Sequence, residues 1–167
     1  RGCIRKCSFC AVPLIEPVFK PYISLGDQIN EIDKRYGAKK DLLLMDNNVL
    51  ASKQFKNIIN EIKAIGFSRG SKLSYTGKNG QSVKANRYVD FNQGVDVRLL
   101  NEAKMNLLSQ IAIKPLRIAF DDISLEDVYK KRIRLAAQYG INHLSNYVLY
   151  NFQDKPEDLY TRLRINL

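Results

Sequence analysis

Three cysteines stand within the first ten residues, at Cys3, Cys7 and Cys10, in the pattern C-x-x-x-C-x-x-C. A structural zinc site usually has four protein ligands, and a disulfide joins two cysteines. Three clustered thiolates instead suit an iron–sulfur cluster in which one iron keeps a position for another ligand. The spacing therefore predicts a metal centre at which a small molecule can bind and react.

Two other interpretations of the cysteines stay open. One is a zinc site completed by His143, the single histidine of the chain, although a structural role is more common for such a residue. The other is a group of free thiols, which Arg5 and Lys6 would make prone to oxidation.

Polar residues follow every strand that the sequence predicts. They are Asp46-Asn47-Asn48, Asn92-Gln93, Asp121-Asp122 and Asn151. The carboxyl ends of parallel strands meet at one edge of a sheet, which is where such sheets carry their functional groups. Asp and Asn are also common turn residues after any strand, but the agreement of all the strand ends favours a site.

The elements that must position these residues alternate along the chain. Short apolar runs predict strands at residues 41–46, 88–92, 116–121 and 143–150, with the first buried on both faces. Apolar residues at helical spacing predict helices at residues 25–36, 52–65, 102–112, 124–140 and 156–163. Ser24 and Ser124 are the expected N-caps of two of these helices. The alternation predicts an α/β fold with parallel strands.

Residues 68–86 interrupt the alternation. The stretch is rich in Gly, Ser and Lys, and it predicts a basic flexible insertion loop or a short hairpin, of which we favour the flexible loop. Both ends of the pattern look cut, because the cysteine loop begins at residue 3 and the last helix stops at residue 167. We therefore expect a fragment of a longer protein, truncated at both ends.

The composition limits the class of protein. Of 167 residues, 27 are Lys or Arg and 17 are Asp or Glu, which gives a formal net charge of +10. This excess either lies dispersed over helix faces, which we favour, or indicates a nucleic-acid partner. No apolar run reaches the roughly 20 residues of a membrane span, so we expect no membrane association. Three closely spaced cysteines suit a reducing compartment, so we expect a cytoplasmic protein.

The cysteine motif resembles that of the radical S-adenosylmethionine (radical SAM) superfamily. The residues that flank the motif, Gly2 and Ala11-Val12-Pro13, look like those of the superfamily's methylthiotransferase-like and cobalamin-associated branches. Residues 44–48 resemble the second-strand segment of those branches, and residues 89–100 a third-strand segment of uncharacterised members. The resemblance covers essentially the whole chain. It implies one core domain over residues 1–167, folded as a partial (β/α)6 TIM-like open barrel.

The superfamily carries a 4Fe–4S cluster on three cysteines, and the fourth iron binds the amino and carboxylate groups of S-adenosylmethionine. Reductive cleavage of the sulfonium then yields a 5′-deoxyadenosyl radical, which abstracts hydrogen from a substrate. The resemblance thus implies an enzyme with these two cofactors and a reductant such as flavodoxin or ferredoxin. RNA is a candidate partner, because some relatives modify tRNA.

The resemblance also implies roles for individual residues. The cluster ligands would be Cys3, Cys7 and Cys10. The methionine amino group would meet the residues that stand where the family usually has Gly-Gly-Glu, namely Asp46, Asn47 and Asn48. Phe9 would pack against the adenine.

The remaining assignments concern the other strand ends. Arg98 would pair with the methionine carboxylate, because a guanidinium suits a carboxylate. Asp121 would hydrogen-bond the ribose, with Gln93 and Asp96 as further candidates. Asn151 is assigned to the adenine, in a segment that lacks the family's Gly-x-Ile-x-Gly pattern. The alternative is a basic α/β module that holds a structural metal in its cysteine loop and binds nucleic acid through residues 68–86.

Overall fold

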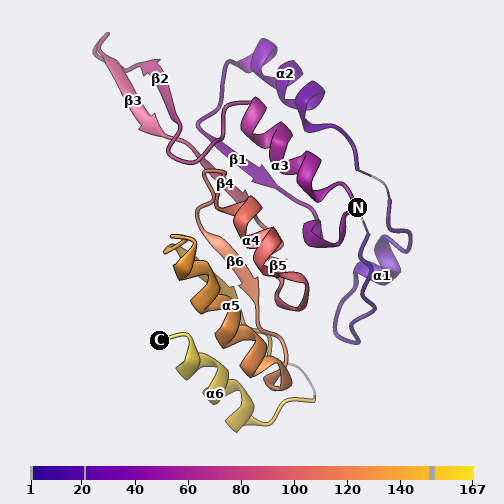
Figure 1. Cartoon of the computed structure of the whole chain (residues 1–167). Coiled ribbons are helices and arrows are strands. Elements are labelled where there is room, and N and C mark those ends of the chain that lie inside the picture. Colours follow the sequence, from indigo (N-terminus) through magenta and orange to yellow (C-terminus); the bar gives the residue numbers. More distant parts are fainter. Residues whose placement is uncertain (1, 21, 151–152) are drawn as a thin grey trace.

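Parallel strands form the centre of the molecule, which is known from a computed structural model that describes residues 2–20, 22–150 and 153–167 (Figure 1). β1 (Asp41–Leu44) pairs with β4 (Tyr88–Phe91), and both run in the same direction. The chain then turns through Gly94, whose φ is +76°, and continues into a second group of parallel strands.

β6 (Leu116–Ala119) is the middle strand of this second group. It lies between β5 (Val95–Asp96) and β7 (Leu144–Tyr147) and is parallel to both. The two groups join where Val89 of β4 bridges in parallel to Ile113, just before β6. The expected α/β fold with parallel strands is therefore confirmed, and the described strands do not close into a barrel.

Helices form a second layer against the strands. α2 (Leu25–Tyr36), α3 (Phe55–Ala64), α4 (Glu102–Leu108) and α5 (Glu126–Gln138) lie side by side in chain order (Figure 1). α6 (Pro156–Ile165) follows near the carboxyl end of β6. None of the described helices is long and apolar enough to cross a bilayer.

The hydrophobic core lies between these two layers. Its most buried members come from both, and they include Ile59, Ile62, Val89, Met105, Leu108, Leu116 and Phe120. Burial alternates along β4 and β6, so one face of each of these strands joins the core, and β1 shows the same contrast. In β1, Leu42 is 6% exposed and Leu43 is 56% exposed. The expectation that this first strand is buried on both faces is therefore wrong among the described residues.

Residues 68–86 form the short hairpin, and the favoured flexible loop is not what the structure has. β2 (Lys72–Thr76) pairs antiparallel with β3 (Ser82–Asn86), from Lys72 opposite Asn86 to Thr76 opposite Ser82. The turn closes through Gly80, whose φ of +73° suits the left-handed conformation that tight hairpin turns require. The glycines at the tip thus reflect turn geometry. The hairpin projects from the end of the sheet opposite the cysteine loop (Figure 1).

The two expected serine caps are replaced by carboxylates. Ser24 precedes α2 but makes no side-chain cap hydrogen bond with the described helix. Glu61 of α3 instead accepts the amide hydrogens of Leu25, at 2.7 Å, and Gly26, at 3.3 Å. At the other helix, the Asp122 side chain accepts from the Ser124 amide at 2.8 Å, which begins the helical segment two residues earlier than expected.

Candidate metal and cofactor site

A cavity of about 180 Å³ lies where the cysteine loop meets the carboxyl ends of β1, β5 and β6. It forms there because parallel strands bring their following residues to one edge of the sheet. The predicted site residues that line it are Cys3, Cys7, Phe9, Cys10, Asn47, Asn48, Gln93, Asp96, Arg98 and Asp121. Residues up to 118 positions apart in the sequence thus share one small space.

Two predicted site residues are not among those that line the cavity. Asp46 lines the neighbouring apolar cavity beside β1, and its side chain accepts the Asn48 amide hydrogen at 2.8 Å. Asn151 lies outside the described residues. His143 is exposed at the start of β7 and lines a third cavity at the opposite end of the strands. The described structure therefore does not bring His143 to the cysteines.

The cysteine loop presents three free, half-buried thiols to the cavity. Cys3 Sγ accepts from the Arg5 amide at 3.3 Å and from Asn48 Nδ2 at 3.7 Å. Burial raises the pKa of the Cys7 thiol, while the nearby Arg98 guanidinium acts in the opposite direction. Within residues 2–20, 22–150 and 153–167, no three Cys, His, Asp or Glu side chains stand close enough together to form a ready metal site.

Glu16 fixes the loop to the end of β1. Its Oε2 atom accepts from the Gly2 amide at 2.7 Å and from Asn47 Nδ2 at 2.8 Å. Gly2 has a φ of +71°, and a Cβ atom there would lie 2.4 Å from the carbonyl oxygen of Val18. Only glycine allows this close approach, so the residue before the first cysteine has a structural reason to be glycine.

Asp96 joins the loop to the strand ends through two arginines. Its Oδ2 atom accepts from Arg5 Nε at 3.0 Å, and its Oδ1 atom accepts from Arg98 Nε at 2.7 Å. Burial alone would raise the pKa of Asp96, but the hydrogen bonds and charges of Arg98 and Arg5 outweigh it and lower the pKa. The carboxylate therefore stays ionised, and the three groups together carry one net positive charge.

Asn48 places an unused acceptor at the cavity. The residue is 3% exposed. Its Nδ2 donates to Cys3, but its Oδ1 has no hydrogen-bond partner among the described residues. A buried polar atom without a partner costs free energy, so such an atom in a native fold calls for an explanation. A ligand that donates a hydrogen bond would satisfy it.

Asp121 supplies a second carboxylate on the far side of the cavity. Burial raises its pKa, and the charges of Arg162 and Arg98 act against that rise. A carboxyl group held in this way favours partners that donate hydrogen bonds, such as hydroxyl groups.

Arg5 and Glu16 are the site residues that the sequence does not predict. Arg5 lines the cavity and pairs with Asp96, and Glu16 holds both Gly2 and Asn47. No motif or spacing in the sequence identifies either residue as part of a site. Their partners lie far away along the chain, so only the folded structure shows what they do.

The cavity thus brings three thiols, an arginine and an unused amide acceptor together. Thiolates bind iron, neighbouring hydrogen bonds tune it, and arginine beside an amide acceptor matches a carboxylate beside an ammonium group. Comparisons of the chain with protein-family models, with curated proteins and with solved structures gave no match in any of the three. The function is therefore inferred from the site.

Proposed function

We propose that this chain is the core of a radical SAM enzyme, which binds a 4Fe–4S cluster and S-adenosylmethionine. The observation that carries the proposal is the single cavity shared by the three cysteines and the polar strand ends of β1, β5 and β6. A cluster with three cysteine ligands leaves one iron open, and the residues around it match the polar groups of one cofactor molecule. The substrate of the enzyme stays unassigned.

Cys3, Cys7 and Cys10 would hold the cluster. The turn in which the Cys10 amide donates to the Cys7 carbonyl, at 3.1 Å, keeps the last two cysteines on one short loop. The donors on Cys3 Sγ, which are the Arg5 amide and Asn48 Nδ2, are of the kind that stabilises a ligating thiolate. A cluster and S-adenosylmethionine held by these residues would supply radical chemistry through reductive cleavage of the sulfonium, with the electron coming from a reductant such as flavodoxin or ferredoxin.

S-adenosylmethionine would bind through its charged groups. Asn48 Oδ1 is the free acceptor that suits the methionine amino group. Arg98 suits the carboxylate, and Asp96 keeps that guanidinium oriented through its own hydrogen bonds. Asp121 and Gln93 suit the ribose hydroxyls, and Phe9, which is 41% exposed at the cavity, suits the adenine.

The same proposal includes the finer architecture. The alternating burial of parallel strands, with a helix layer on one face, supports a partial (β/α)6 open barrel over residues 1–167. We place the enzyme in the cytoplasm, where thiols stay reduced and flavodoxin or ferredoxin can supply the electron.

Anaerobic reconstitution with iron and sulfide tests the cluster. The chain should take up about four irons and show an absorbance shoulder near ~400 nm. Cys3→Ala should lose both signals. Ser8→Ala is the matched control, because Ser8 is exposed in the same loop and its loss should leave iron uptake unchanged. Uptake of zinc without iron would contradict the proposal and support a structural metal site.

Binding of S-adenosylmethionine tests the second half of the proposal. In the reconstituted protein, Asn48→Leu should weaken binding about tenfold, because a hydrogen bond to a charged group is lost. Iron is measured in the same samples and the affinity is compared at equal cluster content, because the substitution also removes the Nδ2 donor to Cys3 Sγ. Unchanged affinity in this variant would show that Asn48 Oδ1 does not meet the ligand.

A further inference from the structure

The hairpin end of the molecule carries an unbalanced positive charge. No Asp or Glu occurs between Glu61 and Asp90. The same stretch contains six basic residues, Lys63, Arg69, Lys72, Lys78, Lys84 and Arg87. The stretch therefore has no carboxylate of its own to balance these cations, a feature that it shares with residues 128–153. It creates a local positive field that attracts polyanions.

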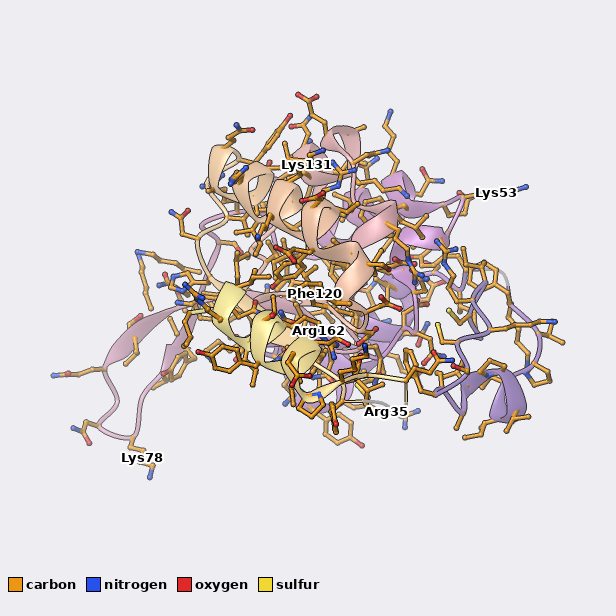
Figure 2. The ribbon with its side chains drawn as sticks, turned by 90° about the horizontal axis from the view of Figure 1, so that it is seen from below. Arg35, Lys53, Lys78, Phe120, Lys131 and Arg162 are labelled. Carbon is orange, nitrogen blue, oxygen red and sulfur yellow. The ribbon has the colours of Figure 1, made fainter. Side chains whose placement is uncertain are left out.

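The hairpin separates charge and ring onto its two faces. Lys84 pairs with Ser74, which is two residues from Lys72 in the same strand. Residues two apart in a strand point to the same side, so Lys72 and Lys84 share one face of the hairpin. Tyr75 stands opposite Val83 on the other face and is 46% exposed. Lys78 lies at the tip, far from the body of the molecule (Figure 2). The ribbon thus presents cations along one side and an accessible aromatic ring on the other.

A second ring lies at the base of the hairpin. Tyr88 lies between two ammonium groups, with Lys40 Nζ 5.5 Å and Lys114 Nζ 4.8 Å from its ring centroid. Tyr88 thus adds an aromatic ring close to two lysine ammonium groups at the base of the hairpin.

A cavity of about 260 Å³ opens at the base of the hairpin. Arg69, Ser71, Tyr88, Lys114 and His143 are among its lining residues. The Arg69 guanidinium is fixed there by the carbonyl oxygens of Tyr139 and Gly140. Ser71 Oγ is buried and has no hydrogen-bond partner among the described residues. The cavity thus offers cations, a ring edge and an unused hydroxyl to a ligand.

We propose that the β2–β3 hairpin and the cavity at its base form a docking surface for single-stranded nucleic acid. Lysines along a ribbon neutralise phosphates, and exposed tyrosine rings stack with unpaired bases of any sequence. An acidic protein would pair with the lysines but would not use the exposed tyrosine rings, so nucleic acid fits this surface better. The surface lies at the opposite end of the strands from the cysteine cavity, so it positions a partner and does not depend on the proposed cluster chemistry.

Fluorescence anisotropy with a labelled 15-nucleotide single-stranded RNA, and with DNA of the same sequence, tests the proposal over a range of salt concentrations. The triple variant Lys72→Gln, Lys78→Gln, Lys84→Gln should bind about tenfold more weakly and reduce the slope of log K against log salt by about 2. Tyr75→Ala should weaken binding about tenfold without changing that slope. Tyr75→Phe should bind like the parent, because it keeps the ring.

The matched control removes the same charge elsewhere. Lys34→Gln, Lys53→Gln, Lys131→Gln changes three exposed lysines away from the hairpin, two of which are labelled in Figure 2. This triple variant should keep most of the affinity, and circular dichroism should show that every variant is folded. Cys3→Ala should bind nucleic acid normally, so a failure of the cluster proposal does not affect this one.

Three outcomes would overturn the docking surface. The first is equal weakening by both triple variants, which would make binding a matter of net charge alone. The second is the absence of binding to either strand at low salt. The third is hairpin-dependent binding to vesicles of anionic phospholipid with no binding to nucleic acid. Equal affinity of the protein for RNA and DNA would support contacts to phosphates and bases. Tighter binding of RNA would indicate an additional contact to the 2′-hydroxyl.

Discussion

Asp96 is the carboxylate that pairs with both Arg5 and Arg98 at the cysteine cavity. Its side chain is 6% exposed and it accepts hydrogen bonds from Arg5 and Arg98. Asp96→Asn should lower the free energy of unfolding at pH 7 by about 2 kcal/mol, because two guanidinium groups lose their counter-charge. Urea denaturation measures this change.

The effect of Asp96→Asn should depend on pH. The folded protein holds the pKa of Asp96 below its ordinary value of 3.8. Its stabilisation is therefore fully present above that value and is lost as the pH falls through the lower, folded-state pKa. The gap between parent and variant should shrink in the most acidic buffers. Asp41→Asn, which breaks only an exposed pair with Lys40, should cost less than about 1 kcal/mol at any pH. A constant gap would contradict this account.

At the scale of elements, α2 depends on α3 for its N-terminus. Glu61 Oε2 accepts from the Leu25 and Gly26 amides and from the Tyr22 hydroxyl, the last at 2.6 Å. Glu61→Gln should weaken these bonds and the favourable charge at the helix start, at a cost of about 1 kcal/mol. Hydrogen exchange should become faster for the first turn of α2 while the middle of α3 is unchanged.

Glu31→Gln is the control for this helix. Glu31 lies on the exposed side of α2 and pairs with Arg35 one turn later, at 2.6 Å. Its substitution should change stability by less than about 0.5 kcal/mol. If both variants exchange alike, the carboxylate of Glu61 is not what holds the start of α2.

At the scale of the whole molecule, Arg162 ties α6 to the strand layer. The residue is 0% exposed and donates to the carbonyl oxygens of Phe120 and Leu149, both at 2.9 Å, and to Asp154. Figure 2 shows Arg162 of α6 beside Phe120. Arg162→Met should destabilise the fold by about 3–5 kcal/mol, because it removes the donor to two carbonyl oxygens and the buried counter-charge of Asp154. Thermal unfolding measures the loss.

Arg164→Gln changes an exposed arginine of the same helix and should have little effect on the unfolding temperature. A small effect of Arg162→Met would mean that α6 is held by its apolar contacts alone. The stacked rings of Phe120 and Tyr129, whose centroids are 4.3 Å apart, would then be the main link between α5 and the strand end.

Local pattern was enough to predict most elements. Apolar spacing gave α2 and α5 nearly their observed positions, and short apolar runs located β1, β4, β6 and β7. Parallel pairing followed from their alternation, and with it the meeting of Asn48, Gln93 and Asp121 at one edge. These features depend on interactions within a few residues, which a sequence pattern records directly.

The sequence by itself thus determined the cysteine loop, the order of the elements and the edge at which the candidate site forms. Only the tertiary structure decided the hairpin in place of a loop, the cap on α2 and the pairing of Arg5 with Asp96. Those last two residues are 91 positions apart, and Leu25 is 36 positions from Glu61. Such contacts depend on how separate elements pack, and no local periodicity encodes which distant charge will arrive beside a given helix end or loop.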